Sequence, residues 1–175
     1  PFYHKLFALT DGGMQIAPDL EQKKEIIEST VELFHSFGVK EPKVACMCAV
    51  EEINPKMPET VEAAELKAMN QRGEITGCIV EGPISFDLAM IPKTAGVKKF
   101  TSPVAGDADI ILAPGIAAGN MLIKSLYTFG GALMGGVVLG GLCPVSMTSR
   151  DSSVESRMAS LLLSCSILNG EKTEE

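Results

Sequence analysis

Residues Thr148 to Asp151 place a serine hydroxyl, a guanidinium and a carboxylate in one short polar turn. An arginine side chain presents a planar fork of donors that binds phosphate through two parallel hydrogen bonds. A helix is expected to begin beside this turn, and the unpaired N–H groups and positive dipole end of a helix N-terminus also attract anions. The sequence therefore predicts an anion-binding site at Ser149 and Arg150. The spacing alone leaves one alternative open, a capped amphipathic helix with a solvated arginine.

This turn joins an expected strand to an expected helix. A glycine-rich apolar run centred on residues 137–139 precedes it, and we interpret this run as a buried strand. Ser152 and Glu155 fit a capping box, which places the helix N-terminus at Ser152 or one turn earlier. Apolar residues then recur with helical spacing and predict one buried face, made of Val154, Met158, Leu161, Leu162 and Cys165.

The rest of the chain alternates between expected strands and expected helices. Apolar runs predict strands at 5–10, 43–50, 76–80 (ended by Glu81-Gly82-Pro83) and 109–113. Periodicity predicts helices at 20–37, 59–72 and 116–129, with short helical pieces at 86–89 and 94–99 around Pro92. This order favours one α/β domain over residues 1–175, with a mainly parallel sheet between helix layers in a three-layer α/β/α arrangement. In such folds the loops at the carboxyl ends of the strands form the site, which here are residues 10–13, 51–58, 81–87 and 148–151, with 114–120 beside them.

The composition restricts the classes of function. The chain has 175 residues, 46% of them hydrophobic, which is enough for one core. Its net charge is −7 and it has no basic cluster, so we expect neither nucleic acid nor an anionic membrane surface as a partner. The N-terminus lacks the layout of a signal peptide.

Two local patterns admit other interpretations. Cys46 and Cys48 share one face of an expected strand, which permits a metal site, although no histidine lies nearby to complete it. The five cysteines are better explained as reduced core thiols of a cytoplasmic protein. The stretch 125–149 carries no charge, and its glycines at 131, 135, 136 and 140 have the spacing found in pairs of membrane helices. Its many glycines, Tyr127 and Pro144 favour buried strands instead.

Five segments, in order, resemble the phosphate acetyl/butyryltransferase family, and most closely its phosphate butyryltransferase branch. They read ALTDGGMQIAPDLEQK, AVEEINPKMPETVEAAEL, EGPISFDLAM, SPVAGDADIILAPGIAAGNMLIKSL and VVLGGLCPVSMTSRDS. The resemblance extends from about Leu6 to Leu163. It implies an isocitrate/isopropylmalate dehydrogenase-like architecture of two α/β lobes, of which this chain resembles the second lobe and the C-terminal segment and lacks the first.

The resemblance also implies an activity and the residues that perform it. The implied reaction is acyl transfer between coenzyme A and inorganic phosphate, giving an acyl phosphate, with no metal and no permanently bound cofactor. Ser149 and Arg150 match the family's Ser-Arg pair, with the serine as an oxyanion donor and the arginine as an anion clamp. A proposed aspartate base of the acetyl branch falls on Ser156 here, and Glu155 is the nearest carboxylate. The remaining residues expected to bind substrate are Gly119, Asn120, Lys124, Asp87 and Asp151.

Each of these assignments has an alternative. Asn120 closing a loop and Lys124 being solvated fit the same pattern, Asp87 fits a helix cap, and Glu155 fits the capping box. For the whole chain, a non-catalytic module that binds coenzyme A or phosphate is the second hypothesis. A dehydrogenase is disfavoured because no G-x-G-x-x-G motif is present. We also expect a cytoplasmic homodimer or higher homo-oligomer.

Overall fold

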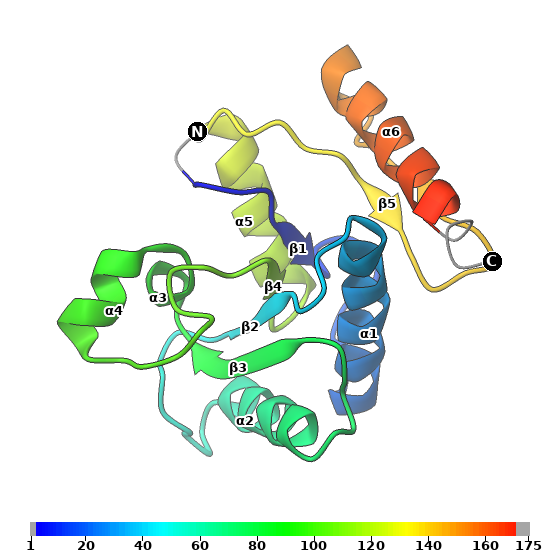
Figure 1. The fold of residues 1–175 in the computed structure, drawn as a ribbon. Coiled ribbons are helices and arrows are strands. Elements are labelled where there is room, and N and C mark those ends of the chain that lie inside the picture. The colour runs from blue at the N-terminus through cyan, green and yellow to red at the C-terminus, as the bar shows by residue number, and fades with distance from the viewer. Residues whose placement is uncertain (1–2, 171–175) are drawn as a thin grey trace.

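The chain forms six helices and six strands over residues 3–170, which the structure, a computed structural model, describes (Figure 1). The strands are β1 (Ala8–Thr10), β2 (Lys43–Met47), β3 (Ile79–Ile84), β4 (Ile110–Leu112), β5 (Val137–Val138) and β6 (Val145–Ser146). The helices are α1 (Leu20–Ser36), α2 (Pro58–Gln71), α3 (Phe86–Met90), α4 (Pro92–Lys98), α5 (Ile116–Thr128) and α6 (Val154–Gly170). The two short helical pieces around Pro92 are confirmed as α3 and α4.

Four of the strands form a parallel sheet in the order β1-β4-β2-β3. Val44 of β2 lies opposite Ile110 of β4 on one side and Val80 of β3 on the other. Parallel neighbours require crossover connections, and here α2 links β2 to β3 while α3 and α4 lie between β3 and β4 in the chain. The predicted α/β fold with a mainly parallel sheet is confirmed.

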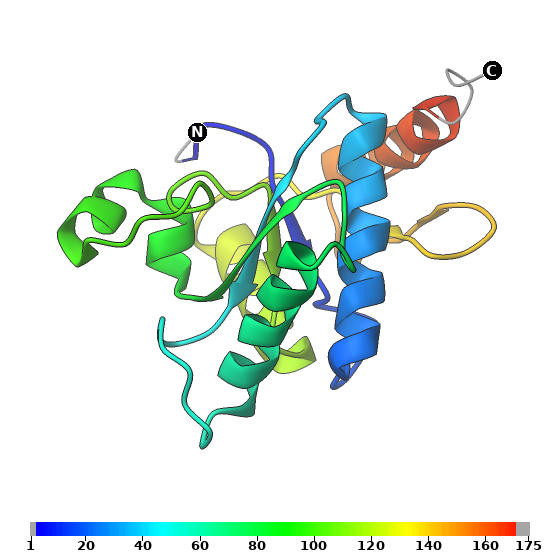
Figure 2. The ribbon, with the colours of Figure 1, turned by 60° about the horizontal axis from the view of Figure 1, so that its bottom comes forward.

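Two apolar cores lie on the two faces of this sheet. Val44, Cys46, Ile110 and Leu112 pack with apolar residues of α1 and α2, including Ile27 and Leu66. The alternate residues Ala45 and Ile111 pack with Leu88 and Val104 on the opposite face. Successive side chains of a strand point to opposite faces, so nearly continuous apolar strands are what a sheet covered on both sides requires. Figure 2 shows α1 and α2 together, away from α3 and α4.

Local sequence features stabilise both ends of α1. The Asp19 carboxylate accepts a hydrogen bond from the Gln22 N–H at 2.9 Å, and the Gln22 side chain accepts from the Asp19 N–H at 3.0 Å. This reciprocal pair satisfies two donors that the first turn of a helix leaves free. Gly38 adopts a φ of 81° directly after the helix, a conformation that glycine takes without steric cost. The predicted helix at 20–37 is thus confirmed to within one residue.

The predicted end of the third strand was wrong. We expected residues 76–80 followed by a turn at Glu81-Gly82-Pro83, whereas β3 starts at Ile79 and continues through that tripeptide to Ile84. Proline lacks a donor and is tolerated in an edge strand, and β3 is at the edge of the sheet. The Asn70 side chain of α2 lies along this strand: it accepts from the Val80 N–H at 3.1 Å and donates to the Ile75 and Cys78 carbonyls at 3.0 Å.

The glycine-rich run does not belong to the parallel sheet. β5 and β6 pair only with each other, as an antiparallel ribbon. The two residues of β5 are half-buried and those of β6 are exposed, so the prediction of a fully buried strand at 137–139 was wrong. Figure 2 shows the loop between them projecting from the body of the molecule.

The C-terminal helix is turned by about half a revolution from its predicted orientation. Val154, Met158, Leu161, Leu162 and Cys165, expected to be buried, are all exposed. The buried side chains are instead Ser156, Ser160, Ser164 and Ile167. Small serines let the helix approach the glycine backbone closely, and the Ser160 hydroxyl accepts from the Gly136 N–H at 2.9 Å. Ser160 and Ser164 donate to the carbonyls one turn back, at 2.8 and 3.1 Å, so these two hydroxyls are paired in the interior.

The structure also bears on the cysteines, on a possible metal site and on the uncharged glycine-rich stretch. Cys46, Cys48 and Cys78 are buried, whereas Cys143 and Cys165 are exposed. Between residues 3 and 170, no group of three or more potential ligand side chains is arranged to hold a metal ion. No helix in the same part of the chain is long and apolar enough to cross a membrane.

Asp107 joins two lysines and a histidine at the amino ends of the strands. Its carboxylate contacts His4 at 2.7 Å, Lys5 at 3.0 Å and Lys43 at 2.5 Å. Burial alone raises its pKa, but the hydrogen bonds from Lys43, Lys5 and His4 outweigh burial and hold the pKa of Asp107 well below its usual range. A lowered folded-state pKa stabilises the fold above the unfolded-state value, near pH 4, and the stabilisation disappears as the pH falls further.

Asp107→Asn is therefore expected to lower the free energy of unfolding at pH 7 by about 1 kcal/mol, a modest figure because the carboxylate is 39% exposed and partly screened. The difference from the wild type should shrink as the pH falls from 5 to 2, because protonation removes the same charge from the wild type. Urea unfolding followed by circular dichroism at a series of pH values measures both. A difference that stays constant over that range would contradict the assignment.

Candidate functional site

The turn between β6 and α6 holds the predicted catalytic pair. The Ser149 hydroxyl donates a hydrogen bond to the Asp151 carboxylate, and the Ser152 N–H donates to the Ser149 carbonyl at 3.1 Å. Because these contacts fix Asp151 against Ser149, the serine and a carboxylate form one unit. All three of Ser149, Arg150 and Asp151 are exposed.

Two cationic side chains lie around this unit. The pKa of Asp151 is lowered, first by the hydrogen bond from Ser149 and further by the positive charges of Lys124 and Arg150. The positive charge of Lys124, on α5, thus acts on the carboxylate of this turn. None of the ion pairs formed within residues 3–168 includes Lys124 or Arg150, so both charges are available to an anion. The Arg157 guanidinium donates to the Arg150 carbonyl at 3.3 Å and anchors the turn to α6.

The N-terminus of α6 is capped one residue later than predicted. The Ser153 hydroxyl, not that of Ser152, accepts from the Ser156 N–H, at 3.2 Å. The pKa of Glu155 is lowered by its own backbone N–H and by Ser153. Within the described residues, no hydrogen bond joins Glu155 to Ser149. The structure therefore places Asp151, rather than Glu155, next to the serine.

The N-terminal part of α5 packs on the loop that follows β1. The Asp11 carboxylate accepts from the backbone N–H groups of Gly13, Met14 and Gln15 at 2.8 to 2.9 Å, which fixes this loop. The Asn120 side chain donates to the Gly12 carbonyl at 3.1 Å. Gly119 is buried there, and a Cβ on it would lie 2.7 Å from the Asp11 carbonyl oxygen, which is too close for any other residue. Gly119 and Asn120 thus hold α5 against the loop that follows β1.

Asp87 lies in a different cluster. The Lys98 ammonium contacts Glu51 at 2.7 Å, Asp87 at 3.4 Å and the Ser85 hydroxyl at 3.1 Å, and Ser85 also donates to Glu51. The pKa of Asp87 is lowered, mainly by Ser85 and then by Lys98. No hydrogen bond or ion pair within the described residues connects this cluster to Ser149. Sequence reasoning missed Lys98, because nothing in its local pattern distinguishes it from a solvated lysine.

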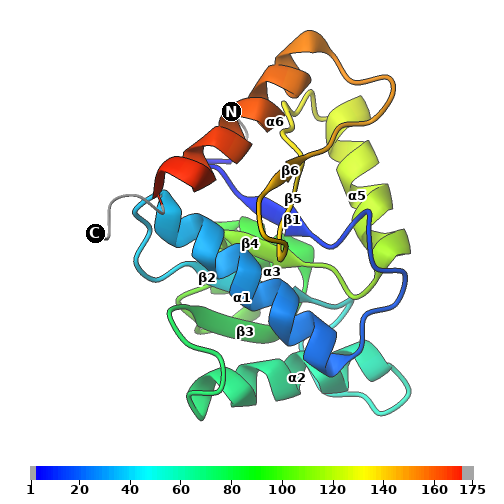
Figure 3. The same cartoon turned by 90° about the vertical axis from the view of Figure 1, so that its right-hand side faces the viewer.

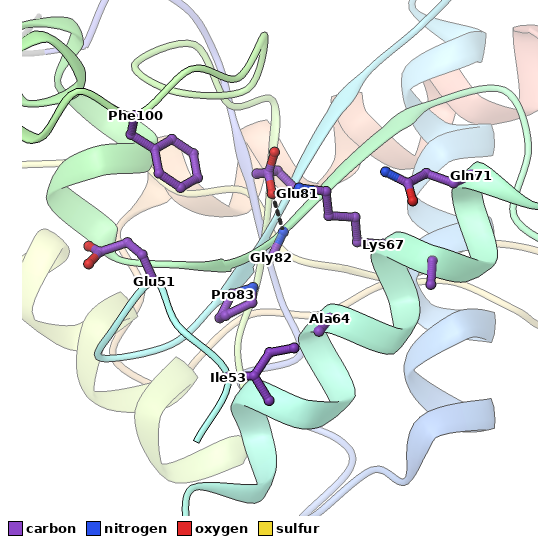
Figure 4. Close-up of a pocket in the computed structure, with 10 residues that line it drawn as sticks. Glu51, Ile53, Ala64, Lys67, Gln71, Glu81, Gly82, Pro83 and Phe100 are labelled. Carbon is purple, nitrogen blue, oxygen red and sulfur yellow. Dashed lines mark hydrogen bonds and ion pairs between the residues drawn. The ribbon is translucent and has the colours of Figure 1, made fainter. Parts of the chain in front are cut away.

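The best-formed hollow lies beside the Asp87 cluster, along the free edge of β3. Its volume is about 290 Å³, and Figure 4 shows Glu51 and Phe100 on one side and Lys67 of α2 on the other. Glu81, buried in β3, accepts from the Lys67 ammonium at 2.6 Å and from the Gly82 N–H at 3.0 Å. A glutamate inside an otherwise apolar strand was the available signal for this pair. Neither the Ser149 turn nor Lys124 lines the hollow.

The geometry of the turn suits binding of an anion and donation of a hydrogen bond. Arg150 and Lys124 supply unpaired positive charge, α6 begins beside them with the positive end of its dipole, and the Ser149 hydroxyl is held in one orientation by Asp151. Fold and site together define an α/β protein with an exposed turn, carrying a serine, an arginine and an aspartate, just before the last helix. The chain belongs to the phosphate acetyl/butaryl transferase family, whose model matches residues 3–165.

Individual relatives agree with this assignment. The chain is 44% identical over 163 residues to a probable phosphate butyryltransferase of Bacillus subtilis, and 45% identical over 164 residues to a phosphate acetyltransferase of Thermotoga maritima. These matches cover 93% and 94% of this chain but 54% and 56% of the relatives. A crystal structure of a branched-chain phosphotransacylase from Enterococcus faecalis superposes with a TM-score of 0.86 at 40% identity, covering 93% of this chain and 58% of that one. The chain thus spans about half the length of the curated relatives it matches.

Proposed function

We propose that this chain is part of an acyltransferase that moves a short acyl group, of butyryl or acetyl type, between coenzyme A and inorganic phosphate. The observation that carries the proposal is the turn at Ser149 and Arg150, which combines unpaired positive charge with an oriented hydroxyl in a member of this family. Both substrates are anionic, and the carbonyl oxygen acquires negative charge when the acyl group is attacked.

The roles follow from the chemistry. The thiolate of coenzyme A attacks the carbonyl carbon of an acyl phosphate, a C–S bond forms, the bond from that carbon to the bridging oxygen breaks, and phosphate leaves with the electron pair. Arg150 and Lys124 hold the phosphate before and after this step. Ser149 donates to the oxygen that becomes negative. The same steps in reverse make the acyl phosphate.

The carboxylate that assists Ser149 is proposed to be Asp151, with Glu155 as the predicted alternative. Both have a pKa below the usual range, whereas an ordinary thiol has a pKa near 8.5, so neither exposed carboxylate is a strong base for a thiol. Covering the turn and excluding water from it raises the pKa of a carboxylate. In the exposed turn, Asp151 therefore orients the Ser149 hydroxyl, and it becomes a competent base only when covered.

Other sequence predictions stay part of the proposal. Asp87 is an additional substrate contact through the Lys98 cluster, while Gly119 and Asn120 act by holding α5 against the loop after β1. Coenzyme A is a substrate rather than a resident cofactor. Residues 1–175 form one domain, the C-terminal part of a two-lobed cytoplasmic enzyme that works as a homo-oligomer.

Binding of phosphate tests the proposal directly. Arg150→Ala is expected to weaken the affinity for phosphate and for coenzyme A by about tenfold to a hundredfold, the loss typical of one charge-assisted contact. Arg150→Lys should recover little, because an ammonium does not reproduce a two-pronged contact. Isothermal titration calorimetry measures both, with Lys93→Ala on α4 as a control that removes an exposed charge elsewhere. Unchanged affinity in the Arg150→Ala variant would show that this turn is not the anion-binding site.

A second function has one observation in its favour. The turn is fully exposed, and its carboxylates are poor bases in that state, which suits a module that binds phosphate or coenzyme A without turnover. Assays of acyl transfer separate the two proposals.

A further inference from the structure

The side chain of Arg157 is held on the turn that carries the candidate site. Figure 3 shows this turn between β6 and the orange first turns of α6, on which Arg157 lies. The Nη2 atom of Arg157 donates a hydrogen bond to the Arg150 carbonyl at 3.3 Å. None of the ion pairs formed within residues 3–168 includes Arg157, whereas Arg72, at the end of α2, binds two glutamates at 2.8 and 2.6 Å. In this part of the chain the Arg157 guanidinium therefore serves the backbone of the site and not a carboxylate.

The Arg150 carbonyl and the Asp151 N–H belong to the same peptide group. The Asp151 carboxylate binds this N–H and also accepts the hydrogen bond from the Ser149 hydroxyl. Because a peptide group is planar, a donor that holds its carbonyl also fixes the direction of its N–H. The contacts thus run without a break from Arg157, through the peptide group and the carboxylate, to the serine hydroxyl. In such a row each hydrogen bond polarises the next.

We propose that Arg157 is a positioning residue for acyl transfer, which sets the orientation of the Ser149 hydroxyl through the peptide group between Arg150 and Asp151 without touching the substrate. This inference rests on the proposed function, because it assigns a part in that reaction. Arg150 and Lys124 keep the role of binding the phosphate. Arg157 contributes to the step in which Ser149 donates to the developing negative charge, so the loss of its side chain should lower kcat rather than weaken phosphate binding.

The start of α6 does not depend on this guanidinium. The Ser153 hydroxyl caps the helix by accepting from the Ser156 N–H at 3.2 Å, and the Arg157 N–H donates to the Ser153 carbonyl at 3.1 Å. Both contacts are made by a serine side chain or by the backbone, so they persist when the Arg157 side chain is shortened. Glutamine and arginine are about equally favourable in a helix. Arg157→Gln should therefore change the turn and leave α6 in place.

Steady-state kinetics test the proposal in the joined protein, by which we mean residues 1–175 fused to a polypeptide that corresponds to the part of the Bacillus subtilis relative outside the match. Arg157→Gln should lower kcat for transfer from butyryl-CoA to phosphate by about tenfold, less than the loss of a direct oxyanion donor, with little change in KM for phosphate. Arg157→Lys should restore part of the rate, because an ammonium also donates to a carbonyl. Arg72→Gln, which removes an exposed arginine at the end of α2, should leave the rate unchanged.

A double-mutant cycle separates positioning from a general effect on structure. In a Ser149→Ala background, Arg157→Gln should lower kcat no further, because the effects of two residues that act through one contact do not add. An equal loss in both backgrounds would overturn the proposal, as would an unchanged kcat in the single variant. A loss confined to KM for phosphate would overturn it in favour of a direct anion contact.

A second readout does not require turnover. The hydrogen bond from Ser149 is the largest cause of the lowered pKa of Asp151, ahead of its own N–H, Lys124 and Arg150. In residues 1–175 alone, the short chain, Arg157→Gln should raise the pKa of Asp151 toward its ordinary value, which ¹³C NMR of labelled aspartate carboxyl groups measures during an acid titration. An unchanged pKa would overturn the proposal. If the joined protein without substitutions shows no turnover, the proposed function fails, and this titration still decides whether Arg157 orients the turn.

Discussion

Residues 1–175 alone are expected to transfer acyl groups from butyryl-CoA to phosphate at least about a hundredfold more slowly than the same residues joined to a polypeptide that corresponds to the part of the Bacillus subtilis relative outside the match. The reaction requires a thiol, a carbonyl and a phosphate to be held within bonding reach, and a misplacement of about 1 Å costs roughly that factor. Between residues 3 and 168, the Ser149 turn is exposed, and neither Lys124 nor Arg150 forms an ion pair. Release of free thiol in the presence of phosphate or arsenate, followed spectrophotometrically, measures the rates.

The control for this experiment is the fold of the short chain. Its circular dichroism and cooperative unfolding should match those of a folded α/β domain, since the two apolar cores on the parallel sheet are complete without α6. Full activity in the folded short chain would refute the requirement for a second part. A joined chain that binds phosphate and coenzyme A without turnover would favour the non-catalytic module.

In the joined protein, Ser149→Ala is expected to lower kcat by about 10² to 10³, the loss typical of one oxyanion donor, with a smaller effect on KM. The serine forms its contact with the developing charge and not with the resting substrate, so the loss falls on kcat. Steady-state rates at saturating butyryl-CoA and phosphate measure it. A Ser149→Ala enzyme as fast as its parent would exclude the hydroxyl from the reaction.

The two carboxylates near this serine provide a matched pair for the same assay. Asp151→Asn should lower kcat substantially and shift the acid limb of its pH profile, because Asp151 contacts Ser149, whereas Glu155→Gln should alter neither. Glu155 contacts the helix cap, so its replacement is expected to affect stability alone. The opposite ranking would restore Glu155 to the role first predicted for it.

The sheet and its helices were predictable because local pattern and tertiary environment agree there. The runs at Lys43–Met47 and Ile110–Leu112 are apolar on both faces, and the structure covers both faces. The capping pair Asp19 and Gln22 lies within a single turn, so its effect is readable from four residues. The orientation of α6 could not be predicted the same way. Periodicity locates the apolar face of a helix, but it does not reveal whether that face meets this chain or another polypeptide.

The candidate site was predictable in part for a related reason. Ser149, Arg150 and Asp151 are adjacent in sequence, and Lys124 lies in a segment that resembles the same family, so the resemblance grouped these four residues. Asp87 was grouped with them because all of these loops leave the same edge of the sheet. Its ion-pair partner, Lys98, is 11 residues after it and also contacts Glu51, which is 36 residues before Asp87, and which of several loop charges pair depends on the twist of the sheet. The residues around Asp87 in the sequence do not indicate which of these charges it pairs with.

The side chain of Asn70 has a consequence for how this chain behaves at high concentration. A free sheet edge is a template onto which another molecule adds a strand, and it is a usual starting point for aggregation. Asn70 accepts from the Val80 N–H and donates to the Ile75 and Cys78 carbonyls just before β3, and the Glu81 carboxylate accepts from the Gly82 N–H, so two N–H groups of β3 are already paired. Addition of another strand at this edge is therefore disfavoured, and Asn70→Ala should make the chain more prone to form intermolecular β-structure.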